Sequence, residues 1–183
     1  MNAINRQHLN NLRGKDRELR YAAFQYLLKQ TDQSVDWAYE AWEELVNLLE
    51  SKDNHERSIA AQLLSNLAKS DPEGRLFTDL DKIMRITRDE KFVTARHALQ
   101  SLWKVGVTSD ALRTQVIRRL SRCFRECADE KNHTLIRYDI IEVFRKIFDT
   151  APTQSIKIIS LKLIETEENP KYRKKYLSLW KDV

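Results

Sequence analysis

The sequence predicts an all-α protein in which helix pairs stack into a solenoid, a right-handed α-α superhelix of about five pairs. Three observations support this prediction. The 183 residues include only three glycines and three prolines, whereas sheet proteins use both residue types in their turns. Apolar residues recur with the 3.6-residue period of a helix. One residue pattern also returns after about 35 to 45 positions, the length of a two-helix repeat.

The repeated pattern begins with an Asp or Asn in a polar turn. It continues into a helix that carries an arginine, then a small or apolar residue, then a large apolar residue. The five copies read Asp16-Leu19-Arg20-Ala23-Leu27, Asp53-Arg57-Ala60-Leu64, Ala95-Leu99 without the arginine, Ile136-Arg137-Ile140-Phe144, and Asn169-Tyr172-Arg173-Tyr176-Trp180. One pair cannot bury its own apolar face, so stacking of neighbouring pairs is expected to close the core.

Each copy is expected to follow another helix with its own apolar period. Start signals precede three of these helices, at Ser70-Asp71-Pro72-Glu73, Ser109-Asp110 and Pro152, because a capping side chain or a proline favours the first helical turn. Gly14 and Gly106 are expected at helix C-termini in the left-handed conformation. The prediction is therefore ten helices in one domain over 1–183, with repeats at approximately 1–32, 33–70, 71–106, 107–149 and 150–183.

On these residues the chain resembles the HEAT and armadillo-like family of α-helical repeats. The resemblance is carried by the first two copies of the pattern, which begin at Asp16 and Asp53, and by the Ile136-Arg137 and Tyr172-Arg173 pairs. It extends over all five repeats and is architectural. It implies a curved stack in which the second helix of each pair lines the concave side, and it implies no reaction.

The recurrent arginines, at positions 20, 57, 137 and 173, suggest two interpretations. They could form a ladder that binds phosphate groups. On a helical wheel, however, they fall at the edge of the buried stripe, and a buried guanidinium must be paired. The sequence therefore favours ion pairs inside the stack.

The concave surface is expected from the polar positions of the second helices. Gln25, Gln62, His97 and Glu142 occupy equivalent places in successive repeats, and the candidate groove also includes Tyr21, Gln100, Tyr138 and Arg145. Neutral hydrogen-bonding groups beside two tyrosines suit a peptide or a helix as ligand. An ordinary solvated face explains the same residues equally well.

The net charge of +5 is uneven, because residues 107–183 hold 16 Lys and Arg against 11 Asp and Glu. Arg118, Arg122 and Arg125 share one face of a first helix and form an outer basic patch. A solvated face is the simplest interpretation, and an acidic or phosphate-bearing partner is the alternative.

Other kinds of site have little support. The two cysteines, Cys123 and Cys127, fall on the buried side of one helix, so no metal or cofactor is expected. Three glycines leave no room for a phosphate-binding loop. Without a signal peptide or an apolar run of membrane-spanning length, the chain is expected in the cytoplasm and off the membrane.

Two functions from different classes follow. The first is a non-catalytic scaffold or adaptor that holds a protein or peptide segment in its concave groove. The alternative is a DNA-binding HEAT-like protein related in fold to alkylpurine DNA glycosylases, with weak nucleic-acid binding through the basic C-terminal half. An enzyme is not expected, because no catalytic Trp–Asp pair can be matched and the groove is mostly neutral before the fourth repeat.

Overall fold

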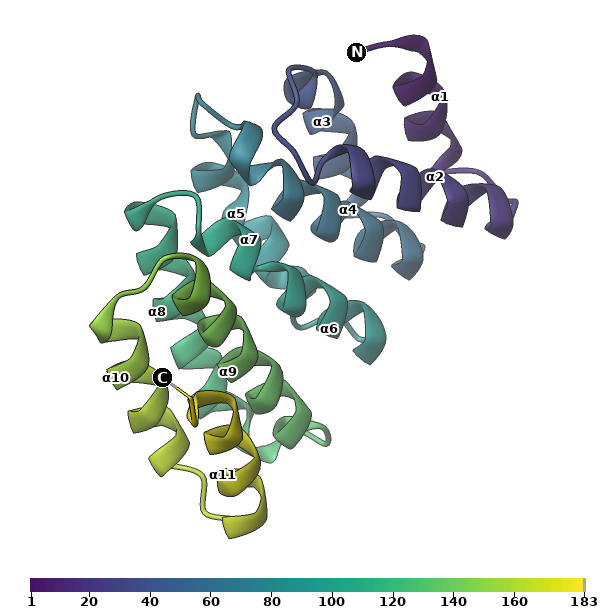
Figure 1. Cartoon of the computed structure of the whole chain (residues 1–183). Helices are drawn as coiled ribbons and strands as arrows, with labels where there is room; N and C mark the ends of the chain where they lie inside the picture. Colours follow the sequence, from purple (N-terminus) through teal and green to yellow (C-terminus); the bar gives the residue numbers. More distant parts are fainter. Residues whose placement is uncertain (183) are drawn as a thin grey trace. The chain divides into compact units, whose positions relative to one another are not determined.

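The computed structural model describes residues 1–182 and is helical throughout that range. Helices hold 76% of the residues, and the described part of the chain contains no strand. This confirms the all-α helical-repeat fold. The chain divides into two compact units, Met1–Ser101 and the part that starts at Leu102, and each is described by itself. The helices are labelled in Figure 1.

The first unit consists of three helix pairs. They are α1 (Ala3–Asn11) with α2 (Arg17–Gln30), α3 (Ala38–Leu48) with α4 (Asn54–Leu67), and α5 (Arg75–Ile86) with α6 (Phe92–Ser101). Two second helices begin as the pattern predicts, since the Asp16 carboxylate accepts from the Leu19 amide at 3.1 Å and Asp53 from the His55 amide at 2.7 Å. Helix α4 packs against both α2 and α6, which places the three second helices side by side.

The second unit contains two long pairs and a short leading helix. Its helices are α7 (Trp103–Gly106), α8 (Asp110–Glu126), α9 (His133–Thr150), α10 (Gln154–Glu165) and α11 (Pro170–Leu177). The hydroxyl of Ser109 caps α8, and Asn169 caps α11 ahead of Pro170. Helix α9 packs against α7, α8, α10 and α11, so it forms the centre of this unit.

Large apolar side chains fill the interior of each unit. Trp42 is completely buried in the first unit, and its indole nitrogen donates to Asp79 at 2.9 Å. Phe124, Phe144 and Tyr176 are completely buried in the second. Trp42 therefore packs in the core at little cost, because the hydrogen bond satisfies the only polar atom of its indole.

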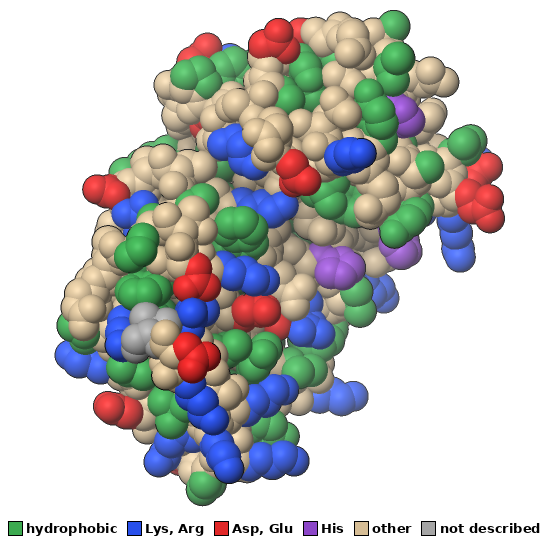
Figure 2. Space-filling view, viewed as in Figure 1, with side chains coloured by type: hydrophobic (Ala, Val, Ile, Leu, Met, Phe, Trp, Pro, Cys, Tyr) green, Lys and Arg blue, Asp and Glu red, His purple; other side chains and the backbone are tan. Residues whose placement is uncertain are grey.

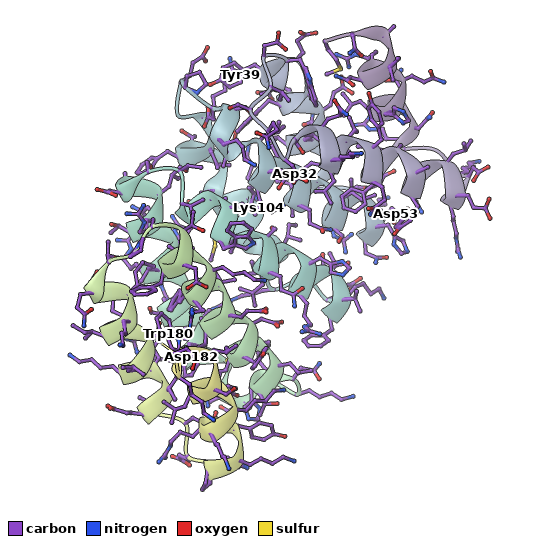
Figure 3. All side chains as sticks on the ribbon, in the orientation of Figure 1. Asp32, Tyr39, Asp53, Lys104, Trp180 and Asp182 are labelled. Carbon is purple, nitrogen blue, oxygen red and sulfur yellow. The ribbon has the colours of Figure 1, made fainter. Side chains whose placement is uncertain are left out.

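Three of the recurrent arginines form ion pairs with an acid of the following repeat. Arg20 pairs with Asp53 at 2.7 Å, Arg57 with Asp89 at 2.6 Å, and Arg137 with Glu167 at 2.8 Å. Figure 3 labels Asp53 at the start of α4, beside α2. Arg173 instead donates to the backbone oxygen of Glu167 at 2.7 Å. The prediction that these guanidinium groups are used inside the stack is confirmed.

Three details of the sequence prediction are wrong. Gly14 and Gly106 do not adopt the left-handed conformation, and within the described residues only Gly74 has a positive φ, of 72°. Gly106 matters for another reason, because a Cβ there would lie 2.5 Å from Cδ1 of Ile147 on α9. Helix α6 also ends at Ser101, and the separate α7 follows it, so the third pair is interrupted. Helix α5 begins at Arg75, after the Asp71 carboxylate has accepted its first amides.

The small residue of the repeat gives a stability prediction. Ala60 is completely buried on α4. Replacing it with leucine is expected to lower the free energy of unfolding by about 1–3 kcal/mol, because a packed core does not accept extra methyl groups without strain. Chemical denaturation measures this, with His55→Leu at an exposed position of α4 as the matched control. An unchanged midpoint for Ala60→Leu contradicts the predicted close helix contact.

Candidate functional site

A groove runs over the second helices of the first unit. Its volume is about 490 Å³, and it is lined by residues of α2, α4 and α6: Arg17, Arg20, Tyr21, Phe24, Gln25, Leu28, His55, Ser58, Ile59, Gln62 and His97. Phe24 and Ile59 are buried, and Leu28 is half-buried. These apolar side chains line the groove together with the more exposed polar side chains of Gln25, His55 and His97.

The polar side chains of the groove come from three neighbouring helices. Gln25 and His97 are exposed on α2 and α6, and Gln62 is half-buried on α4. The Gln62 amide donates to both the carbonyl and the hydroxyl oxygen of Ser58, at 3.2 Å each, and the Ser58 hydroxyl lies 3.1 Å from Nδ1 of His97. Both amide hydrogens of Gln62 are thereby used, and its carbonyl oxygen is left to accept.

Burial lowers the pKa of His97, and the positive charge of Arg96 lowers it further. The imidazole is therefore neutral at neutral pH, with one ring nitrogen able to donate and the other able to accept. A neutral His97 adds directional hydrogen bonding to the groove and no charge.

Ser58 and His97 lie within hydrogen-bonding distance, but the pair lacks the accessible hydroxyl and the oriented base of a catalytic serine. Ser58 is 7% exposed in the middle of α4, and its hydroxyl already accepts from Gln62. A catalytic serine needs an accessible hydroxyl and a base that a third group orients. No carboxylate hydrogen bond to His97 is present among the described residues. This polar cluster is better suited to binding.

Four of the residues that the sequence proposed for the groove lie together in it: Tyr21, Gln25, Gln62 and His97. Gln100 lies one turn further along α6, outside the lining. The apolar residues Phe24, Leu28 and Ile59 were not proposed, because their spacing also fits a buried core face. Only the packing of α2 on α4 shows that they open into a groove.

The remaining three proposed residues, Tyr138, Glu142 and Arg145, belong to α9 of the second unit. The ammonium group of Lys175 lies 4.6 Å from the ring centre of Tyr138, and Glu142 faces Lys146 at 3.6 Å. Arg145 donates to the backbone oxygen of Leu179 at 2.6 Å and to Asp149 at 2.7 Å. Its guanidinium therefore holds α9 to the C-terminal segment, which leaves it poorly placed for a ligand.

The outer basic patch is divided by the structure. Arg118 and Arg125 line a second groove, between α8 and α10, whereas Arg122 lies outside it and pairs with Glu126. This groove measures about 620 Å³, and Ile117, Ile156 and Ile159 form its apolar part. On the face drawn in Figure 2, Lys and Arg side chains gather over α9 and α11, so positive charge is not confined to α8.

The thiols are core groups. Cys123 and Cys127 are buried and are not joined in a disulfide, and burial raises the pKa of Cys127 to about 11, so its reactive thiolate is disfavoured. Residues 1–182 contain no group of three or more His, Cys, Asp and Glu side chains that could hold a metal ion. The same residues include no helix long and apolar enough to cross a membrane.

Solved structures similar to this chain include engineered proteins and a designed armadillo repeat protein. One engineered protein shares 15% identity with a TM-score of 0.56 and full coverage of both chains. A second shares 16% with a TM-score of 0.55, covering 98% of this chain and 78% of its own. A designed armadillo repeat protein shares 13% with a TM-score of 0.51, covering 94% and 97%. No family model and no curated protein matches the sequence.

These similarities establish the architecture. The chain has the HEAT and armadillo-like arrangement of stacked helix pairs that the repeat pattern predicted. At 13–16% identity, the comparisons carry no further information about what the protein binds.

Proposed function

We propose that this chain is a non-catalytic protein-binding module that holds a peptide segment in the groove of α2, α4 and α6. The supporting observation is the composition of that groove, whose lining combines the apolar side chains of Phe24, Leu28 and Ile59 with the polar side chains of Gln25, Gln62 and His97. Binding sites for flexible ligands combine an apolar surface with a few polar groups that fix orientation.

The polar groups suit a peptide backbone in particular. A glutamine amide can donate to a backbone carbonyl and accept from a backbone amide, as Gln25 can here. Gln62 keeps its carbonyl oxygen to accept, and His97 keeps Nε2, because its Nδ1 faces the Ser58 hydroxyl. The apolar residues then receive one or two aliphatic or aromatic side chains of the ligand. Tyr21, which is 65% exposed, supplies a rigid aromatic surface at the edge, as interface tyrosines commonly do.

The groove is a poor match for DNA. Duplex binding depends on Lys and Arg along the channel, because phosphate neutralisation supplies most of the affinity. Of the two arginines here, Arg20 is committed to Asp53. These observations favour the scaffold over the glycosylase-like alternative.

Selection from a displayed random peptide library tests the proposal. The Tyr21→Ala/Gln25→Ala variant is expected to bind the selected peptides about tenfold more weakly than the unmodified chain, because it removes an aromatic surface and an amide from one side of the groove. Isothermal titration calorimetry with each purified peptide measures this.

Gln30→Ala is the matched control, since Gln30 is exposed on the same helix outside the groove. It is expected to bind like the unmodified chain. If selected peptides bind the double variant and the control equally well, the ligand lies elsewhere and the proposed groove is wrong.

A further inference from the structure

The groove between α8 and α10 contains two buried hydroxyl groups without partners. Among the described residues, neither Oγ of Ser121 nor Oγ1 of Thr153 makes a hydrogen bond, and both residues line the groove. Ser121 is only 6% exposed. Buried polar groups in native proteins are nearly always hydrogen-bonded. An acceptor or donor supplied by a ligand in this groove accounts for both hydroxyls.

The N-terminus of α10 adds an electropositive edge to the same groove. Thr153 is the N-cap residue, yet its side chain makes no capping hydrogen bond, and the first turn of α10 has no acidic residue. The first amides of a helix lack intrahelical partners and attract negative charge. Side chains normally meet this need within the chain, whereas the first turn of α10 has neither a side-chain cap nor an acid.

The arginines of the groove differ in how far they are already engaged. Arg113 pairs with Asp110 at 2.5 Å and donates to the backbone oxygen of Gly106 at 3.1 Å. Arg118 contacts the side-chain oxygen of Gln115, and Arg125 donates to the backbone oxygen of Ser121. Neither Arg118 nor Arg125 forms an ion pair within the described residues, and both are exposed. They are therefore available to bind carboxylates.

The spacing of these two arginines defines the ligand further. They are seven residues, or two helical turns, apart, so their Cα atoms are separated by about 10 Å along the axis of α8. A helix presents residues i and i+7 on one face at the same spacing. Between them, aliphatic side chains of the ligand at i+3 and i+4 would pack on half-buried Ile159 and on the exposed edge of Ile117, whereas Ile156 is completely buried.

We propose that the groove between α8 and α10 binds an acidic amphipathic helix of a partner protein. Carboxylates at i and i+7 pair with Arg118 and Arg125, a polar group of the helix reaches the Ser121 hydroxyl, and aliphatic residues cover Ile159 and the edge of Ile117. A protein segment fits better than nucleic acid, because phosphates need continuous positive charge and gain nothing from an isoleucine surface. This site is independent of the peptide groove proposed for the first unit.

Fluorescence anisotropy with the full chain tests this. The probe is a labelled peptide of about 15 residues, near the length at which isolated helices form, with Glu at i and i+7 and Leu at i+3 and i+4. The Arg118→Gln/Arg125→Gln variant is expected to bind about tenfold more weakly, because two charge-assisted hydrogen-bonded pairs are lost. Arg122→Gln removes a charge from the same helix outside the groove, so it should bind almost like the unmodified chain.

Ser121→Ala separates a ligand contact from general electrostatic attraction. It leaves the charge unchanged, so a weakening of several-fold supports a hydrogen bond from the hydroxyl to the peptide. The proposal is overturned if the double variant and Arg122→Gln bind alike, or if a peptide of the same composition with its Leu residues out of register binds equally well. It is also overturned if a DNA oligonucleotide of equal charge binds as tightly with the same dependence on Arg118 and Arg125.

Discussion

Replacing Arg137 with methionine is expected to lower the free energy of unfolding by about 3–5 kcal/mol, because it leaves a buried carboxylate without its counter-ion. The side chain of Arg137 is 10% exposed and that of Glu167 is 4% exposed. Arg137 also donates to the backbone oxygen of Phe124 at 3.1 Å, and its guanidinium lies 4.9 Å from the centre of that ring. One side chain of α9 thus contacts α8 and the connection between α10 and α11.

Urea denaturation of a double-mutant cycle measures the effect. Glu167→Gln removes the negative charge and keeps an oxygen that can accept from the Asn169 amide, as Oε1 of Glu167 does now at 3.1 Å. Arg137→Met/Glu167→Gln should therefore be more stable than Arg137→Met alone. Arg122→Met at an exposed position of α8 serves as the control. A double variant no more stable than the single one contradicts the role of the buried pair.

The role of these arginines could be predicted because the signal is local and repeated. A helical wheel places Arg20, Arg57 and Arg137 at the edge of the apolar stripe, and burial requires that a guanidinium be paired. The acidic residue that pairs with each arginine could not be predicted from the sequence. Arg57 and Asp89 are 32 residues apart, and only the stacking of one repeat on the next brings them together.

Glycine conformations could not be predicted in the same way. Gly14 and Gly106 follow apolar helical segments, which is the usual place for a left-handed C-terminal residue. The structure instead requires Gly106 to be small, because the Ile147 side chain approaches it from α9. A contact between residues so far apart in sequence leaves no local pattern. The interruption after Ser101 is hidden too, since Leu99, Leu102 and Val105 keep the helical apolar spacing.

The candidate grooves show where sequence reasoning about single helices stops. A wheel for each helix identified Gln25, Gln62 and His97, and their second helices are neighbours in the first unit. The same method grouped Arg118, Arg122 and Arg125 as one patch. Packing of α10 beside α8 separates them, because it adds Ile156 and Ile159 to the groove and leaves Arg122 outside it. The face that a helix turns toward its neighbour depends on how the helices pack, so it cannot be predicted from one helix alone.

Replacing Asp89 with asparagine is expected to remove an acid-sensitive part of the stability. The hydrogen bond from Arg57 lowers the pKa of the Asp89 carboxyl against the opposing effect of burial, and the Lys91 amide lowers it further. A carboxylate with a lowered pKa in the folded state stabilises the fold fully above its usual pKa. That stabilisation is lost as the pH falls through the folded-state value.

The Asp89 side chain is 5% exposed, and its carboxylate accepts from Nε of Arg57 at 2.6 Å and from Nη2 at 2.9 Å. Near neutral pH, Asp89→Asn should therefore lower the free energy of unfolding by about 1.5–3 kcal/mol, which is the contribution of a hydrogen bond to a charged group. Below about pH 4 the unmodified chain should lose this advantage and approach the stability of the variant. Thermal or urea denaturation at several pH values measures the difference. Asp36→Asn, at an exposed position between α2 and α3, should leave the pH dependence unchanged. A constant difference between Asp89→Asn and the unmodified chain from neutral to acidic pH would show that shape, and not the ionised pair, is what Asp89 contributes.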